Sequence, residues 1–323
     1  MSNPEPVIQT KDLTKVYDTG FRGEQVSALT QLNLEVFPSE IFGYLGPNGS
    51  GKTTTIKLLL GLIFPTSGEI KIMGKKDIYS PQVKKNIGYL PEGSYYPDFL
   101  RGEEILKFYG QLYGLTGKEL NKRIDEVLEI VGMKHARRRM LKGYSKGMRQ
   151  RIGLAQALIS DPQILILDEP TTGLDPIARK EIRDILSRLR DAGKTLFISS
   201  HELLEVEMIT NRVGILYNGI LRVSGTLDEL LISKERILEF ANATDERIQE
   251  IKDRGGDVVD NLEDRIYLKV KDDQELYNTI ELGKTVGLQL VSITPRRETL
   301  EELFVRVVNT AKLERSKNNE HVD

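Results

Sequence analysis

The sequence predicts an α/β protein with a parallel or mixed β-sheet, followed by a smaller α+β domain. In the first 224 residues, short β-type runs alternate with helical patterns long enough to join parallel strands. Beyond Gly225 the predicted elements follow the order β-α-β-β-α-β, which is the order of a ferredoxin-like unit. The length of 323 residues also exceeds what one compact core usually accommodates.

The strands predicted in the first part are short and mostly apolar. They are Val7–Tyr17, Leu32–Val36, Ile41–Leu45, Glu69–Met73, Ile87–Leu90, Ile164–Leu167 and Thr195–Ser199. Helices are predicted at Gly51–Leu62, within Ser94–Lys142, at Ile152–Ile159, and after Asp175, which is the expected N-cap before Pro176. Arg212–Tyr217 and Ile220–Ser224 are predicted to form a hairpin around Asn218-Gly219, a preferred turn dipeptide.

The second part contains the remaining predicted elements. The strands are Leu238–Phe240, Val258–Asp260, Ile266–Val270 and Leu288–Ile293, and the helices are Thr244–Arg254, Gln274–Val286 and Thr299–Val308. The polar composition of residues 311–323 indicates a disordered tail.

The overall composition excludes several functional classes. With 46 basic and 48 acidic residues, the chain has no net field that would recruit nucleic acid or an anionic membrane. It has no cysteine for a disulfide or a thiolate metal site. No secretory signal is visible, and the longest apolar stretch, Leu58–Phe64, is far shorter than the ~20 residues of a membrane helix. We therefore expect a cytoplasmic protein that reaches a membrane only through a partner.

Residues 46 to 53 form the clearest motif in the chain. They read Gly-Pro-Asn-Gly-Ser-Gly-Lys-Thr, which matches the phosphate-binding pattern G-x-x-x-x-G-K-[ST] between a strand and a helix. Glycines let the backbone N–H groups turn toward phosphate oxygens. Lys52 is expected to reach the β- and γ-phosphates of ATP, and the Thr53 hydroxyl to bind Mg²⁺. The alternative is a chance glycine-rich turn. The candidate ATP-binding residues here are Gly46, Pro47, Asn48, Gly49, Ser50, Gly51, Lys52, Thr53 and Thr54.

Two carboxylates end the apolar strand at Ile164–Leu167. The carboxyl ends of parallel strands share one edge of the sheet, so Asp168 and Glu169 should lie near the phosphate loop. Asp168 is then a candidate Mg²⁺ ligand, and Glu169 is a candidate base that polarises an attacking water. The alternative is a pair of solvated acids at a strand end.

A further motif narrows the class of protein. Tyr144-Ser145-Lys146-Gly147-Met148-Arg149-Gln150-Arg151 resembles, in degenerate form, the LSGGQ signature of ATP-binding cassette (ABC) proteins. In that family, the signature binds the γ-phosphate of ATP held by the other subunit. The resemblance therefore implies a dimer in which Ser145, Lys146 and Gly147 complete the partner's site. An ordinary N-capped helix is the alternative.

Other positions agree with the same family in order and spacing. Tyr17 resembles the aromatic residue that stacks on adenine, although a packed strand tyrosine is the alternative. Gly173, Leu174 and Asp175 resemble the loop through which the two subunits sense each other. His201 resembles the switch histidine that contacts the γ-phosphate and positions the water, although a structural role is common for a lone histidine. The resemblance thus implies Glu169, His201 and Lys52 as catalytic residues.

One position departs from the family pattern. Where the family usually has glutamine, this chain has Glu92, which keeps a metal-binding oxygen but does not donate a hydrogen bond when ionised. The implied Mg²⁺ ligands are Thr53, Glu92 and Asp168. Leu90-Pro91-Glu92 and the extension ending Thr299-Leu300-Glu301-Glu302-Leu303-Phe304 are similar to those of ABC-2 type exporters.

The resemblance implies an architecture and a set of partners. The fold is that of a P-loop ABC cassette at residues 1–224, with a mixed-sheet core and a helical subdomain at about 94–160. An accessory α+β domain is expected at 225–310, before the tail at 311–323. The helical insert, which holds several aromatic residues, would receive coupling helices of integral-membrane permease subunits. These aromatic residues are Tyr95, Tyr96, Phe99, Phe108, Tyr109 and Tyr113.

The function implied is that of an ATP-hydrolysing subunit that drives a transporter, most similar to ABC-2 exporters, at the cytoplasmic face of the cell membrane. ATP binding would close a dimer with a second copy or a paralogue, and hydrolysis would reopen it. One alternative is a non-transport ABC ATPase that acts on nucleic acid or ribosomes. Such proteins usually carry tandem cassettes or a long coiled coil, and neither pattern is visible. Another alternative, a regulatory protein that binds ATP without turnover, disagrees with the presence of Glu169 and His201.

Overall fold

The computed structural model describes residues 4–18, 25–93 and 96–319. The chain forms two compact units. Unit 1 contains residues 1–227 and 304–323, and unit 2 contains residues 228–303. The chain thus leaves unit 1 close to the boundary expected at 225. It returns at Phe304, whereas a single C-terminal domain was expected to extend to residue 310.

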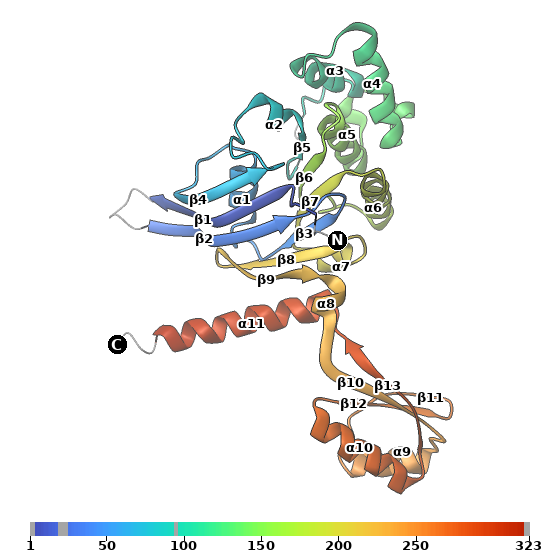
Figure 1. The fold of residues 1–323 in the computed structure, drawn as a ribbon. Helices are drawn as coiled ribbons and strands as arrows, with labels where there is room; N and C mark the ends of the chain where they lie inside the picture. The colour runs from blue at the N-terminus through green and yellow to red at the C-terminus, as the bar shows by residue number, and fades with distance from the viewer. Residues whose placement is uncertain (1–3, 19–24, 94–95, 320–323) are drawn as a thin grey trace. The chain divides into compact units, whose positions relative to one another are not determined.

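The centre of unit 1 is a six-stranded mixed sheet in the order β5-β6-β7-β3-β8-β9 (Figure 1). The paired strands from β5 to β8 are parallel, and β9 runs antiparallel to β8. This confirms the predicted mixed sheet. The strands are β3 (Ile41–Leu45), β5 (Ile87–Leu90), β6 (Ile164–Asp168), β7 (Thr195–Ser200), β8 (Arg212–Tyr217) and β9 (Ile220–Thr226).

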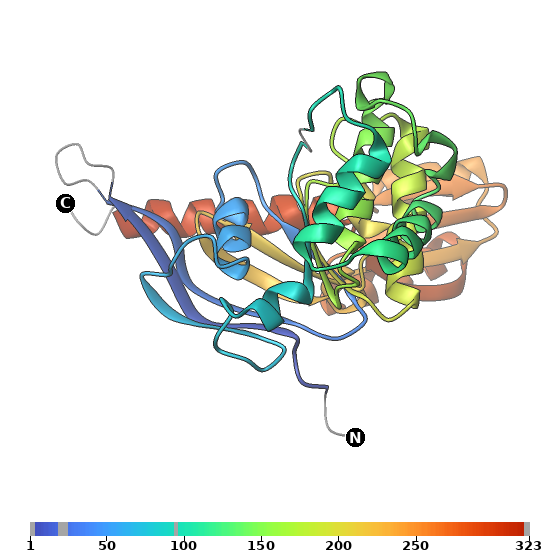
Figure 2. The ribbon, with the colours of Figure 1, turned by 90° about the horizontal axis from the view of Figure 1, so that it is seen from above.

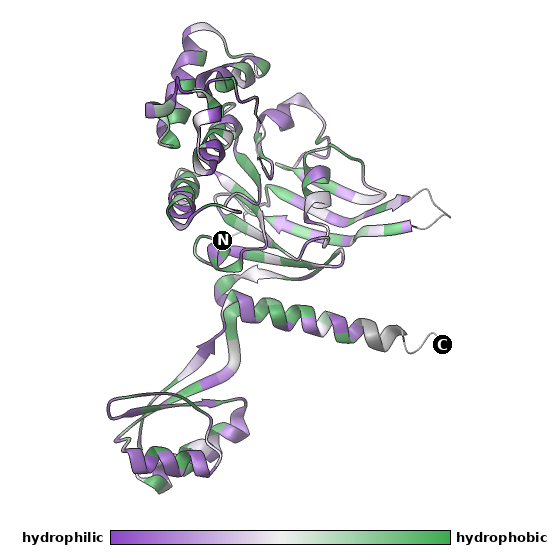
Figure 3. Cartoon of the chain, turned by 180° about the vertical axis from the view of Figure 1, so that it is seen from behind, coloured by the Kyte–Doolittle hydropathy of each residue, from purple (hydrophilic) through white to green (hydrophobic). Residues whose placement is uncertain are grey.

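The middle strands are apolar because both faces of the sheet are covered. Along β6, Leu165 and Leu167 join one buried cluster, while Ile164 and Ile166 join another on the opposite face. This alternation is the two-residue period of a strand. Figure 3 shows the hydrophobic colouring of the central strands. Strands buried on both faces leave only their ends for polar side chains, so the acids that follow Leu167 lie at the sheet edge.

A second, three-stranded antiparallel sheet in unit 1 has the order β2-β1-β4. Its strands are β1 (Ile8–Asp18), β2 (Gln25–Val36) and β4 (Ser67–Ile72). In chain order, helix α1 (Lys52–Leu59) precedes β4 and helix α2 (Pro81–Lys85) follows it. Strand β2 begins seven residues before the predicted Leu32, since its first half pairs with the end of β1 and Val26 lies opposite Tyr17. The apolar side of α1 packs into the same buried cluster as this sheet.

The helical part of unit 1 contains three helices that pack against one another: α3 (Gly102–Leu112), α4 (Gly117–Ile130) and α5 (Lys146–Leu158). They gather at one end of unit 1 in Figure 1 and lie beside one another in Figure 2. Short 3-10 turns at Lys134–Ala136 and Leu141–Gly143 connect α4 to α5, and α6 (Pro176–Asp191) and α7 (Leu203–Glu207) follow. The predicted start of this part at Ser94, and Tyr95, lie outside the described residues.

Unit 2 has the predicted element order β-α-β-β-α-β. A short helix, α8 (Leu227–Leu231), precedes β10 (Ile232–Ala241), α9 (Asp245–Asp253), β11 (Val258–Leu262), β12 (Arg265–Val270), α10 (Asp273–Val286) and β13 (Gln289–Arg297). The four strands form an antiparallel sheet in the order β11-β12-β10-β13. The apolar sides of α9 and α10 join the inner residues of this sheet in one buried cluster.

The last element, α11 (Leu300–Asn319), corrects a prediction. We expected a helix ending near Val308 and a disordered tail at 311–323. The helix instead continues to Asn319, and residues 320–323 lie outside the described part of the chain. The helix carries both hydrophobic and hydrophilic residues along its length (Figure 3), and Ala311 is only 3% exposed. This burial stabilises a helical turn that composition alone assigned to disorder. Among the described helices, none is both long and apolar enough to span a bilayer.

Candidate functional site

The phosphate loop connects β3 to α1, in the arrangement that the sequence predicts. Gly51 has a φ of 111° and a Cβ there would lie 2.5 Å from the Ala28 carbonyl oxygen, so only glycine fits. The Ser50 N–H donates to the Pro47 carbonyl at 3.1 Å, which tightens the turn before the helix. The backbone therefore curls as a phosphate-binding loop requires.

Lys52 lies inside this loop. Its Nζ donates to the Gly46 carbonyl at 2.6 Å and lies 4.0 Å from Glu169 Oε1. Burial lowers the pKa of the Lys52 ammonium, while the nearby charges of Glu169, Asp168 and Glu92 act on that pKa in the opposite direction. A single ammonium thus faces three carboxyl groups.

A pocket of about 280 Å³ brings most of the predicted site residues together. Its lining includes the predicted residues Pro47, Asn48, Gly49, Gly51, Lys52, Thr53, Thr54, Glu92, Asp168, Glu169 and His201. Val26, Ser27 and Ala28 of β2 also line it, and the sequence did not single them out. No motif marks these three residues. They could be found only through the pairing of β2 with β1, in which Val26 lies opposite Tyr17.

Asp168 ends β6 and is 5% exposed. The Ser199 hydroxyl, at the neighbouring register position of β7, donates to Asp168 Oδ1. Burial raises the pKa of Asp168, with a smaller contribution from the charges of Glu169 and Glu92, and the bond from Ser199 acts against this rise. Burial together with Asp168 and Glu92 also raises the pKa of Tyr89 to about 12. The carboxyl groups of Asp168, Glu169 and Glu92 are therefore close enough at this edge of the sheet to interact electrostatically.

Glu169 is held by contacts on both carboxylate oxygens. Nδ1 of His201 lies 2.8 Å from Oε1, and the Thr172 hydroxyl donates to Oε2 at 2.9 Å. The backbone of Glu169 has a φ of 50°, a left-handed conformation that is uncommon outside glycine, and its N–H donates to the Ser199 carbonyl at 3.1 Å. Such strained residues concentrate at functional sites. A carboxylate fixed in this way can orient a water molecule and accept its proton.

Tyr17 does not line the pocket, although its pairing partner Val26 does. Tyr17 is 37% exposed, and Lys15 Nζ lies 5.0 Å from the centroid of its ring. An exposed ring at this place is available for stacking, but its role in adenine binding stays a prediction.

The signature-like segment lies outside the pocket of its own chain. Ser145 caps α5 and accepts a hydrogen bond from Met148 N–H at 3.2 Å. A Cβ on Gly147 would approach Ala178 Cβ to 2.9 Å, which shows how closely α5 and α6 pack here. Asp175 caps α6 by accepting from the Ala178 N–H at 2.9 Å, which confirms its predicted structural role. The two predicted subunit-contact segments, 145–147 and 173–175, thus lie close together, and neither lines the pocket.

Taken together, the fold and the pocket define a P-loop nucleoside triphosphatase, since a glycine loop with its lysine faces a strand-end acid pair. The ABC transporter family matches residues 29–172. An ABC transporter ATP-binding protein of Nostoc sp. is 39% identical over 95% of this chain and 91% of its own length. The bacitracin transport ATP-binding protein BcrA of Bacillus licheniformis is 37% identical over 94% and 97%. The ATP-binding cassette MJ0796, solved as a dimer with ADP and phosphate, has a TM-score of 0.61 and 26% identity over 68% of this chain and 98% of its own.

The chain therefore belongs to the ABC transporter ATP-binding proteins. It is an ATP-binding and ATP-hydrolysing subunit of an ABC transporter.

The raised pKa of Asp168 leads to a stability prediction. Because folding raises this pKa, the ionised residue destabilises the folded state, and stability is lost as pH rises from the usual carboxyl pKa through the folded one. We expect Asp168→Asn, which can still accept from Ser199, to raise Tm at pH 7 by about 2–4 °C in EDTA without nucleotide. The gain should shrink toward about pH 4.

A matched control is Glu69→Gln, which removes an exposed carboxylate whose pKa is lowered by the hydrogen bond from Lys76. This variant should not raise Tm. A lower Tm for Asp168→Asn at pH 7 would show that the buried charge stabilises the folded protein, contrary to this account.

Proposed function

We propose that this ATPase powers an exporter of the ABC-2 type through separate integral-membrane subunits, and that it lies at the cytoplasmic face of the membrane. The observation that carries the proposal is the match to BcrA, which extends over 94% of this chain and so includes unit 2. A Nod factor export ATP-binding protein of Cupriavidus metallidurans is also 37% identical, over 71% of this chain. In this proposal unit 1 contains the cassette and unit 2 is an accessory domain. A net charge of -2 would not attract nucleic acid, so we propose no nucleic-acid partner.

Within the pocket, we assign Lys52 and the loop N–H groups to the phosphates of ATP. We assign adenine to Tyr17, which lies outside the pocket lining but pairs with Val26 of that lining. Thr53, Glu92 and Asp168 would hold Mg²⁺, and the donor set fits, because these hard oxygen ligands line one pocket. Mg²⁺ supplies neutralisation of the charge on the phosphate oxygens.

The chain's own catalytic work then falls to two residues. Glu169 orients the attacking water and accepts its proton, since its carboxylate lines the pocket and is fixed there by His201 and Thr172. His201 keeps that carboxylate in place through its Nδ1 contact at 2.8 Å. His201 is also 44% exposed at its side chain, which leaves its other nitrogen available to a γ-phosphate.

We further propose that the working form is a dimer, with a second copy or a paralogue. Ser145 and Lys146 are exposed, and with Gly147 they lie outside the pocket of their own chain. The start of α5 therefore offers its N-terminal N–H groups to a ligand held by another subunit. The loop at Gly173, Leu174 and Asp175 lies next to this segment and would contact the same partner.

Sedimentation velocity tests the dimer. Without nucleotide the purified chain should sediment as a monomer or weak dimer, and ATP should shift it to a tighter dimer, because the nucleotide contributes contacts to both subunits. Ser145→Arg should keep ATP binding but remove this shift, since a long cation replaces the helix-capping hydroxyl. Glu129→Arg, on the exposed side of α4, serves as the control.

Two outcomes would contradict the dimer proposal. One is an ATP-induced dimer that forms equally well with Ser145→Arg. The other is a chain that stays monomeric at all ATP concentrations. A tight dimer without nucleotide would instead assign the contact to another surface, with unit 2 as the first candidate.

The helical insert is our candidate for the surface that receives the membrane subunits. Phe99 is 73% exposed, and Phe108 and Leu112 on α3 are 55% and 67% exposed. Tyr109 and Tyr113 instead pack against the buried cluster below, and Tyr96 donates to Gln156. The described aromatic residues thus divide into a packed set and an exposed set, and the exposed set is the one available to coupling helices.

A further inference from the structure

The β8–β9 hairpin contacts the phosphate loop directly. At its turn, the Gly219 N–H donates to the Ser50 carbonyl at 2.8 Å, and the Gly219 carbonyl accepts from the Thr30 N–H at 2.8 Å. Gly219 has a φ of 73°, and a Cβ there would lie 2.8 Å from the Ala28 carbonyl oxygen. The turn is therefore inserted tightly between β2 and the phosphate loop.

The contact at Ser50 has a consequence for ATP binding. The peptide group that joins Ser50 to Gly51 is planar, so a fixed Ser50 carbonyl also fixes the direction of the Gly51 N–H. Successive loop N–H groups of this kind are the phosphate donors of the motif. Ser50 is 2% exposed, so its carbonyl relies on the hairpin turn rather than on bulk solvent.

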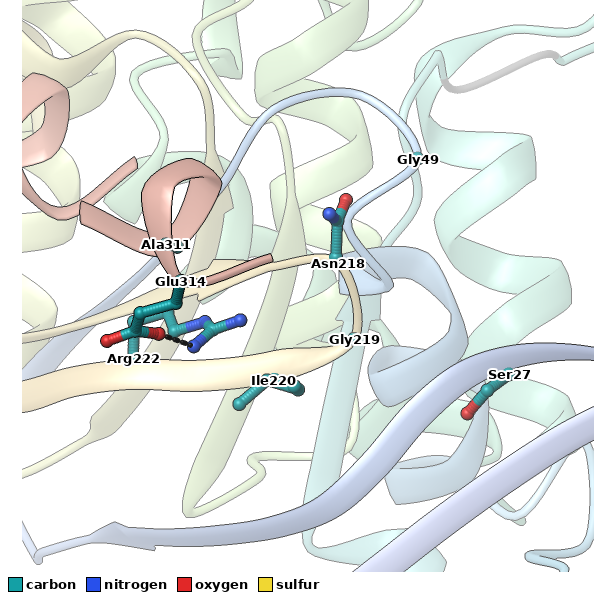
Figure 4. Close-up of a pocket in the computed structure, with 8 residues that line it drawn as sticks. All are labelled: Ser27, Gly49, Asn218, Gly219, Ile220, Arg222, Ala311 and Glu314. Carbon is teal, nitrogen blue, oxygen red and sulfur yellow. Dashed lines mark hydrogen bonds and ion pairs between the residues drawn. The ribbon is translucent and has the colours of Figure 1, made fainter. Parts of the chain in front are cut away.

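Helix α11 contacts the same hairpin three residues beyond Gly219, at Arg222. Arg222 Nη1 of β9 lies 3.0 Å from Glu314 Oε2, and Ala311, one helical turn before Glu314, is 3% exposed. A pocket of about 550 Å³ separates the helix from the loop, and it shares Ser27 and Gly49 with the ATP pocket. Figure 4 shows the Arg222–Glu314 pair on one side of this pocket and Gly49 on the other.

We propose that Arg222 and Glu314 are positioning residues for ATP binding. Their ion pair holds α11 on β9, and the hairpin turn transmits this support to the phosphate loop through the Ser50 carbonyl. This inference rests on the assignment of the loop as the ATP site. It goes beyond that assignment because it gives the C-terminal helix α11 an influence on the affinity for ATP.

Charge reversal at Glu314 separates positioning from simple electrostatics. Glu314→Arg adds positive charge near the loop, so a purely electrostatic effect would tighten ATP binding. Positioning predicts the opposite: Kd and KM for MgATP rise about threefold, the scale of a partly exposed ion pair, with kcat unchanged. The double variant Arg222→Glu/Glu314→Arg restores the pair and should return Kd toward the original value. We would measure Kd with the full-length chain by fluorescent-nucleotide titration.

The matched control is Glu129→Arg, which breaks the Lys134–Glu129 pair of 2.7 Å in the helical part and makes the same charge change. It should leave Kd and KM unchanged. Unchanged or tighter ATP binding by Glu314→Arg, or failure of the double variant to restore affinity, would overturn the inference. Lys52→Ala, measured in parallel, distinguishes a failure of this inference from a wrong assignment of the loop. Normal ATP binding by Lys52→Ala would show that the loop is not the ATP site.

Discussion

Replacing Glu169 with glutamine should lower the rate of ATP hydrolysis by about 10²–10⁴-fold, the usual contribution of a general base. Glutamine preserves the size of the side chain and can still accept from the Thr172 hydroxyl, which lies 2.9 Å from Oε2. It has no negative charge, so it neither accepts a proton from water nor balances Lys52. Steady-state phosphate release measures the loss, and MgATP binding should persist because Lys52 and Thr53 are intact.

Blocked turnover should also accumulate the ATP-bound dimer, which size-exclusion chromatography with MgATP would detect. The matched control is Glu40→Gln, which neutralises another buried carboxylate; Glu40 pairs with Arg212, and neither residue lines the pocket. It should retain hydrolysis. If Glu169→Gln hydrolysed ATP at the original rate, Glu169 would not be the base, and the contact with His201 would have a purely structural role.

The sequence predicted those parts of the site whose residues are contiguous. The phosphate loop and the acids at 168 and 169 each follow an apolar strand, and the strand-end argument placed them at the same edge. All of the predicted loop residues except Gly46 and Ser50 line the pocket, together with Glu92 and His201. A local pattern suffices here because parallel strands deliver their carboxyl ends to one place.

Contacts that depend on strand register were not predictable. Ser199 donates to Asp168 only because β6 and β7 are neighbours with these residues at matching positions. The sequence singled out His201 but not its contact with Glu169, which lies 32 residues earlier. The extent of α11 is a similar case, since its last turns have the polar composition of a tail. The polar composition favours disorder, but the buried Ala311 and the Arg222–Glu314 pair stabilise the helix through tertiary contacts.

Lys52→Ala should weaken MgATP binding by about 10- to 100-fold, because hydrogen bonds to a charged group contribute about 1.5–3 kcal/mol. Lys52 is the only lysine or arginine among the residues that line the described pocket, where it faces Glu92, Asp168 and Glu169. Without it, the triphosphate would approach three carboxyl groups with no opposing side-chain charge. Titration of the full-length chain with a fluorescent ATP analogue would measure the loss.

Lys57→Ala is the matched control, since Lys57 is exposed on the same helix and its removal changes the net charge equally. This variant should bind ATP normally. The Lys52 variant should also raise the pKa of Asp168 further, because Lys52 lowers that pKa in the intact protein. The remaining ATP binding by Lys52→Ala should be strongest with Mg²⁺ present, because the ion replaces part of the lost positive charge. Equal ATP affinity for Lys52→Ala and Lys57→Ala would show that the triphosphate does not bind at this loop, whatever the family of the chain.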